Sequence, residues 1–121
     1  MESTERATRV AAVADLHCRK NSQGAFQPLF QEVARTADVL ALCGDLTDHG
    51  LVEEAQVLAR EITAAVKIPV VAVLGNHDHE TDNQVEITNV LGEAGVTLLD
   101  GEACEVRGIS FAYPYVSLYC L

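Results

Sequence analysis

The sequence predicts an α/β fold built on a parallel β-sheet. Three short apolar runs are almost continuous rather than alternating, which is typical of strands buried on both faces. These runs are Arg9 to Ala14, Val39 to Cys43 and Pro69 to Leu74. Segments with helical periodicity separate them, and hydrophobic residues make up 49% of the 121-residue chain, enough for one domain with a modest core. The order β-α-β-α-β-α implies right-handed crossovers, and we expect helices on both faces of the sheet.

Each predicted helix has its own signals. Apolar residues of the first follow i, i+3, i+4 spacing at Phe26, Leu29, Phe30, Val33 and Ala37. The second repeats this spacing at Leu51, Ala55, Leu58, Ile62 and Ala65. Pro28 suits the first turn of the first helix, and two glutamates suit that of the second. A third helix is predicted to start near Asp82 or Asn83 and to end before Gly95, a favourable residue after a helix.

The pattern changes after Gly95. Two short apolar segments, 96–99 and 103–106, flank Asp100-Gly101 and predict a β-hairpin with an Asp-Gly turn. Residues 108–112 are predicted to add one more strand. The last stretch, 113–121, carries no charge and all three tyrosines, and it has no clear periodicity.

Charge and cysteine content exclude several classes of protein. A net charge of −10 argues against a general nucleic-acid binder, because phosphate backbones attract basic surfaces. The acidity suits carboxylates that bind metal cations, or simply a solvated acidic surface. The four cysteines form no C-x-x-C pair, so neither a zinc ribbon nor a disulfide scaffold is indicated. With no signal peptide and no membrane-spanning run, we expect a soluble cytoplasmic protein without membrane partners.

Every apolar run ends in a polar cluster. The clusters read A-D-L-H, C-G-D-L-T-D-H-G and L-G-N-H-D-H. Because ligands bind at the carboxyl ends of parallel strands, we expect seven polar side chains to converge there: Asp15, His17, Asp45, Asp48, Asn76, His77 and Asp78. Carboxylates with imidazoles suit divalent transition metals, and a carboxylate can bridge two ions. One such cluster is ordinary turn chemistry, but three at successive strand ends favour a site.

The motifs D-L-H, G-D-L-T-D and G-N-H-D, in this order, resemble the signature of the calcineurin-like metallophosphoesterases. The resemblance implies half of an α/β/β/α sandwich, with residues 1–112 as the N-terminal part of the domain and 113–121 as an atypical apolar tail. It also implies a dinuclear-metal hydrolase that cleaves phosphate mono- or diesters with a metal-activated hydroxide.

The metal ligands follow from the same resemblance. Asp15 and His17 would bind the first divalent ion, Asp45 would bridge both ions, and Asn76 would bind the second through its side-chain oxygen. Such ligands fit Mn, Fe, Zn or similar ions.

The catalytic roles also follow from the resemblance. His77 would face the scissile phosphate, as proton donor or as stabiliser of developing charge, and Asp48 would pair with His77 and orient it. Asp78 is assigned to holding the loop through main-chain amides. His49 stands where the protein Ser/Thr phosphatases carry arginine, which leaves small phosphomonoesters, phosphodiesters or nucleotide derivatives as substrates.

The histidine content departs from the family pattern. The family supplies one isolated histidine and a G-H-x-H motif from its second half, whereas the last histidine here is His79. The second metal site would be incomplete, and we expect an N-terminal half cut or frame-shifted near Tyr113, with weak or no activity. Its open sheet would favour a homodimer or other association.

Two alternatives remain open. One is a non-catalytic metal- or partner-binding remnant that needs a second chain. The other is a receiver-type signalling domain, although Lys67-Ile68-Pro69 precedes a strand here instead of following one. Among the cysteines, Cys18 and Cys43 flank the motifs, and small buried side chains explain them better than reactive thiols.

Overall fold

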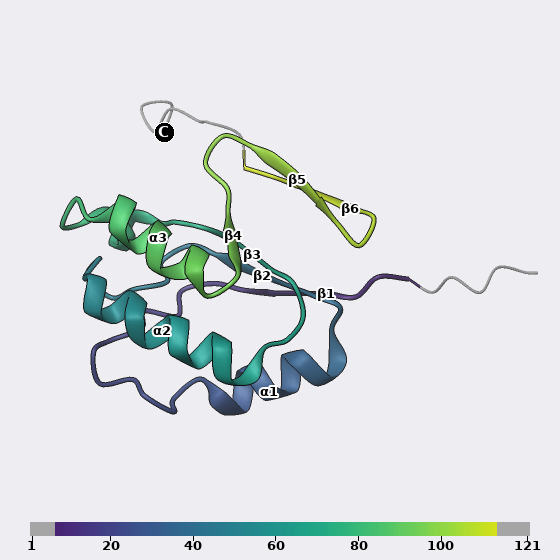
Figure 1. Ribbon diagram of the computed structural model, residues 1–121, viewed down its shortest axis with the longest axis horizontal. Coiled ribbons are helices and arrows are strands. Elements are labelled where there is room, and N and C mark those ends of the chain that lie inside the picture. The colour runs from purple at the N-terminus through teal and green to yellow at the C-terminus, as the bar shows by residue number, and fades with distance from the viewer. Residues whose placement is uncertain (1–6, 114–121) are drawn as a thin grey trace, which may run out of the picture.

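The structure, a computed structural model, describes residues 7–113 and is built on a four-stranded parallel sheet (Figure 1). Its strands lie in the order β1-β2-β3-β4 and span Val10–Val13, Val39–Cys43, Val70–Val73 and Val96–Leu98. Each neighbouring pair is parallel, which confirms the predicted fold class. Within the described residues, no helix is long and apolar enough to cross a membrane.

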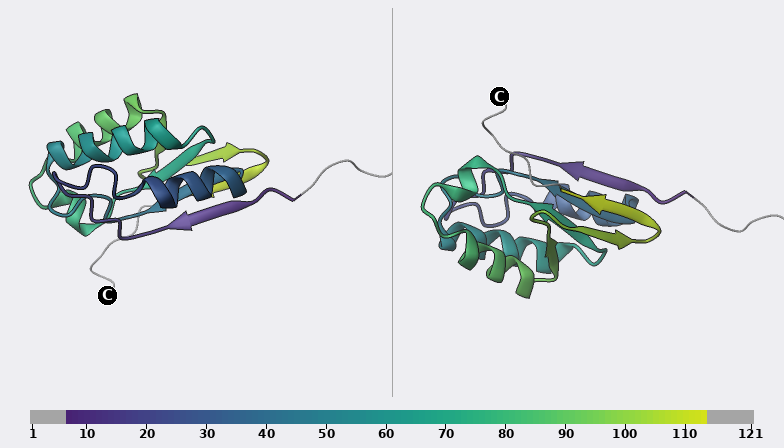
Figure 2. Two further views of the ribbon diagram at one scale, coloured as in Figure 1. Left: turned by 90° about the horizontal axis from the view of Figure 1, so that it is seen from below. Right: turned by 90° about the horizontal axis from the view of Figure 1, so that it is seen from above.

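Three helices connect the strands: α1 (Gln27–Thr36), α2 (Val52–Ala65) and α3 (Gln84–Glu93). All three cover the same face of the sheet (Figures 1 and 2). The expectation of helices on both faces is therefore wrong. Each new strand is added beside the previous one in a constant direction, so successive right-handed crossovers place every helix on one side.

Side chains of the sheet alternate between two cores. On the helical face, residues such as Leu40, Leu42 and Ala72 join buried side chains of the helices, among them Phe30 and Leu58. Full burial of a leucine or phenylalanine side chain stabilises the fold by about 1.5–3 kcal/mol. The opposite face has a smaller core made of Val39, Val71 and Leu99, against which Cys104, Val106 and Phe111 pack.

That opposite face is covered by an antiparallel hairpin of β5 (Ala103–Val106) and β6 (Ile109–Ala112), seen in front of the sheet in Figure 2, right. The pairing of Val106 with Ile109 leaves Arg107 and Gly108 as the turn, and both have positive φ, 53° and 80°. This is the backbone that the favoured two-residue hairpin turns require. The strand predicted over 108–112 is confirmed.

The hairpin predicted around Asp100-Gly101 is wrong. Residues 96–98 instead form β4, which extends the parallel sheet beside β3 with Val70 opposite Val96. The N–H of Leu99 continues this ladder by donating to the carbonyl of Ala72 at 2.9 Å. Burial of Val96 and Leu99 favours this pairing, and the Asp100-Gly101 segment carries the chain to the other face of the sheet.

Candidate functional site

The ends of β1 and β2 are joined by main-chain hydrogen bonds beyond the sheet. The N–H of Asp15 donates to the carbonyl of Gly44 at 3.1 Å, and that of His17 donates to the carbonyl of Asp45 at 3.0 Å. Cys18 then forms a parallel bridge with Thr47. The D-L-H and G-D-L-T-D motifs therefore run side by side, as the shared carboxyl edge of parallel strands predicts.

Three of the predicted ligand residues have left-handed backbone conformations. The φ values are 60° for Asp15, 50° for His17 and 52° for Asp45. This region is disfavoured for residues with a Cβ, typically by about 1–3 kcal/mol each, and it concentrates at functional sites. The hydrogen bonds between the two loops hold these residues in place.

Asp78 joins the end of β3 to the end of β2. Its carboxylate is fully buried and accepts hydrogen bonds from the N–H of Leu46 at 3.1 Å and of Gly75 at 2.8 Å. The N–H and hydroxyl of Thr47 add two more, at 2.8 and 2.6 Å. The predicted role of Asp78, holding the loop through main-chain amides, is confirmed.

Gly75 is required by close approach rather than by an unusual φ. A Cβ atom built on it would collide with the main-chain nitrogen and the carboxylate of Asp45. A Cβ atom built on Gly50, whose φ is 72°, would lie 2.8 Å from the main-chain oxygen of His77. The glycines therefore let the loops after β2 and β3 pack against each other.

One group of donors matches part of the predicted metal site. Asp15, His17 and Asp45 each offer a ligand atom, and these atoms lie within 4.8 Å of one another. Two carboxylates and an imidazole are a suitable donor set for a divalent transition metal, so the residues present fit one such ion. Asn76 begins the short 3-10 helix η1 (Asn76–His79) and is exposed, and its role as a ligand stays a prediction.

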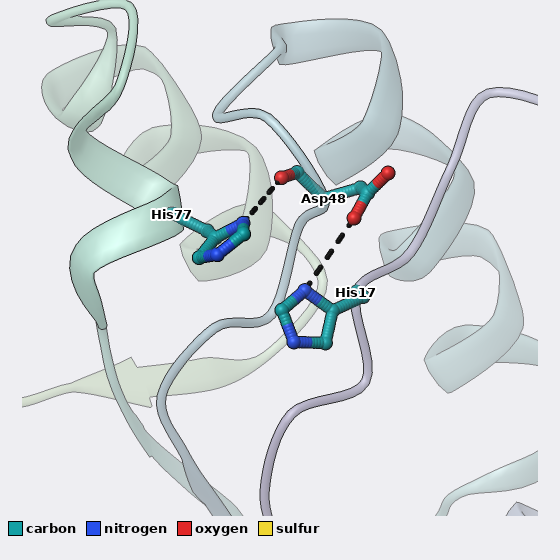
Figure 3. Close-up of side chains that lie close together, drawn as sticks. All are labelled: His17, Asp48 and His77. Atoms are coloured by element: carbon teal, nitrogen blue, oxygen red, sulfur yellow. Dashed lines mark hydrogen bonds and ion pairs between the residues drawn. The ribbon is translucent and has the colours of Figure 1, made fainter.

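A second group shares His17 and adds Asp48 and His77 (Figure 3). The two imidazole rings meet edge to face with centroids 4.6 Å apart. His17 Nδ1 lies 3.5 Å from Asp48 Oδ1, an ion-pair distance that is long for a hydrogen bond. This nitrogen is buried and has no hydrogen-bond partner among the described residues. His17 is shared by both groups, and its unsatisfied buried ring nitrogen supports a ligand site here.

His77 is positioned by the main chain. Its Nδ1 lies 2.6 Å from the carbonyl oxygen of Asp48, and its N–H donates to Asp45 Oδ1 at 3.0 Å. The bond to the Asp48 carbonyl raises the pKa of His77 above 6.5, and the charges of Asp45, Glu80 and Asp48 raise it further, while desolvation opposes them. Asp48 thus contacts His77 through its main-chain oxygen rather than through its carboxylate.

The Asp48 carboxylate instead joins several basic groups. Besides His17, it lies 3.1 Å from Arg19 Nε and 3.4 Å from His49 Nε2. Glu80 contacts the other ring nitrogen of His49 at 3.3 Å and Nδ1 of His77 at 3.5 Å. Sequence reasoning missed Arg19 and Glu80. Their signal was proximity to the motifs, two residues after His17 and three after His77.

The cysteines and the last histidine lie outside these groups. Cys18 is fully buried, and burial, followed by the charge of Glu54, raises the pKa of its thiol to about 12, so the thiol stays protonated. Cys43, expected to be buried, is exposed because it ends β2 on the face that the helices leave open. His79 is exposed and belongs to neither donor group.

Comparison with known families agrees with this arrangement. The profile of the calcineurin-like phosphoesterase family matches residues 8–116, which include all three motifs. No match emerged when the sequence was compared with the curated proteins. Because the match spans most of the chain, this protein belongs to the calcineurin-like phosphoesterase family.

Proposed function

We propose that this site serves metal-dependent hydrolysis of phosphate mono- or diesters. The observation that carries the proposal is the convergence of Asp15, His17 and Asp45 within 4.8 Å at the strand ends of a phosphoesterase-family chain. Asp15 and His17 would hold a first divalent ion, with Asp45 shared between this ion and a second one at Asn76. Bound divalent ions supply Lewis-acid polarisation of phosphoryl oxygens and a water of lowered pKa.

His77 is the proposed general acid. A carbonyl oxygen only accepts hydrogen bonds, so the contact with Asp48 places a proton on Nδ1 of His77. The raised pKa favours the doubly protonated ring, in which Nε2–H also donates. A proton held at Nε2 is available to the leaving oxygen of an ester, and the Asp48 carbonyl fixes the ring orientation.

Hydrolysis of bis(p-nitrophenyl) phosphate and p-nitrophenyl phosphate by the chain loaded with Mn²⁺ or Zn²⁺ tests the proposal. We expect slow turnover that metal removal abolishes, because the sequence offers no histidine beyond His79 to complete the second metal site. Asp45→Asn and His77→Gln should lose this turnover, whereas His79→Gln, a change in the same short helix, should keep it. Turnover that survives Asp45→Asn would refute the assignment.

A second candidate is a metal- or partner-binding chain without catalysis. The same shortage of histidines favours it, since the second ion would have Asp45 and Asn76 as its ligands from this chain. Metal binding that Asp45→Asn abolishes, together with no turnover for either ester, would select this candidate over the hydrolase.

A further inference from the structure

A pocket of about 610 Å³ opens beside the candidate site. Its lining includes Arg19, Lys20, Asn21, Asp48, His49 and Glu54. Asp48 belongs both to this lining and to the donor group with His17 and His77. The pocket is therefore contiguous with the place where a phosphoryl group would react.

Two cationic side chains line this pocket, although the chain as a whole is acidic. The sequence has 8 lysines and arginines against 18 aspartates and glutamates, yet the consecutive pair Arg19 and Lys20 lies here. Arg19 is 66% exposed, and its ion pair with Asp48 uses Nε, so the two terminal nitrogens remain for a ligand. Among residues 7–113, no carboxylate lies within ion-pair distance of the Lys20 ammonium.

The carboxylates of the pocket are turned inward. Glu54 is 2% exposed, and its Oε1 accepts hydrogen bonds from the N–H groups of His49 and Leu51 at 2.9 and 3.1 Å. The side chain of Asp48 is 17% exposed and is held by Arg19 and by the histidines already described. The groups that reach solvent are therefore the guanidinium, the ammonium and the His49 imidazole.

The loop that carries the two cations is held in place by hydrogen bonds. The N–H of Arg19 donates to Ser22 Oγ at 2.9 Å, and the side chain of Gln23 donates to the carbonyl of Lys20 at 2.7 Å. The carboxylate of Glu61 on α2 accepts bonds from two main-chain N–H groups of the same loop, at 3.0 and 3.3 Å. Arg19 and Lys20 therefore extend from a main chain that these hydrogen bonds hold in place.

We propose that this pocket binds a second phosphate group of the substrate, so that the preferred substrates are diphosphates and their organic esters. A guanidinium fork beside an ammonium is the chemistry that recognises phosphate. The proposal rests on the proposed function for the identity of the reacting group, but the pocket binds its phosphate through Arg19 and Lys20 alone.

Isothermal titration of the metal-free chain with inorganic pyrophosphate, orthophosphate and ADP tests the pocket. Metal is removed on a chelating resin, because a soluble polyanionic chelator would compete for the cations. We expect pyrophosphate and ADP to bind more tightly than orthophosphate. Arg19→Gln and Lys20→Gln should each weaken both diphosphates by about tenfold, the loss of one charge-assisted contact. Arg60→Gln, a matched removal of an exposed cation on α2, should change neither.

Equal pyrophosphate affinity in Lys20→Gln and Arg60→Gln, or no binding to the unmodified chain, would overturn the proposal. Lys20→Gln decides the case if Arg19→Gln unfolds, because the Lys20 side chain has no ion pair to lose with any other residue of 7–113. The phosphoesterase proposal and the pocket proposal can be refuted independently. If the chain does not hydrolyse bis(p-nitrophenyl) phosphate, the proposed function is wrong, but pyrophosphate binding to the pocket is still expected, since that ester carries no second phosphate.

Discussion

The carboxylate of Asp78 accepts hydrogen bonds from both the N–H and the hydroxyl of Thr47, 31 residues earlier in the chain. With the bonds from Leu46 and Gly75, this buried carboxylate has four donors around it. Asn in its place would turn an amide N–H₂ toward donors, so Asp78→Asn should lower the free energy of unfolding by about 3 kcal/mol. Urea denaturation measures this, with Asp82→Asn in an exposed loop as the control. Similar midpoints for the two variants would contradict the role of Asp78.

Gly75→Ala should disturb the metal site as well as the fold. The added methyl would press on Asp45, and overpacking of this kind costs about 1–3 kcal/mol. The matched change Gly92→Ala, in α3 where a Cβ meets nothing within 4 Å, should instead stabilise by about 0.5–1 kcal/mol. Thermal unfolding and Mn²⁺ titration of both variants check this. Gly75→Ala with unaltered Mn²⁺ affinity would show that Asp45 adjusts freely.

The two groups of candidate metal ligands that share His17 can be distinguished by mutation. If Asp15, His17 and Asp45 hold the ion, Asp45→Ala abolishes a weak Mn²⁺ site, Asp15→Asn weakens it, and His77→Gln leaves it unchanged. If His17, Asp48 and His77 hold the ion instead, His77→Gln weakens Mn²⁺ binding and Asp15→Asn leaves it unchanged. We expect the first result, and isothermal titration with His79→Gln as the control distinguishes the two. Tight binding of two ions per chain would contradict the incomplete second site.

The titration of His77 should differ between the folded and the unfolded chain. The bond to the Asp48 carbonyl and the nearby carboxylates raise its folded-state pKa above 6.5. A group with a raised folded-state pKa contributes stability that is complete below the unfolded pKa and is lost as pH rises through the folded one. NMR titration of the metal-free chain, with and without urea, measures both values. A pKa for His77 in the folded state at or below the value in urea would refute the contact with Asp48.

Much of the fold could be predicted from the sequence, because the signals for its strands and helices come from neighbouring residues. Most residues of the runs at Val39–Cys43 and Val70–Val73 are buried, and the polar ends of these runs meet because parallel strands share one carboxyl edge. The start of α3 after Asn83 and its end before Gly95 also follow from neighbouring residues.

The errors came from choices that local sequence does not encode. Strand order decides which face a helix covers, and the partner of residues 96–98 depends on burial against β3 rather than on the Asp-Gly pair. Within the site, the motif predicted contact between Asp48 and His77. It did not predict that the carbonyl would make this contact while Arg19 engages the carboxylate, because that depends on how two loops cross.

The left-handed backbones of Asp15, His17 and Asp45 set stability and function against each other. Glycine at any of these positions would relieve the backbone strain, and it would also remove a metal-ligand side chain from the site. A library of variants selected for heat resistance alone should accumulate glycine there and lose Mn²⁺ affinity. Selection for metal binding should keep the strained residues. The identities of residues 15, 17 and 45, where the backbone is strained, should therefore report whether metal binding is kept during directed evolution.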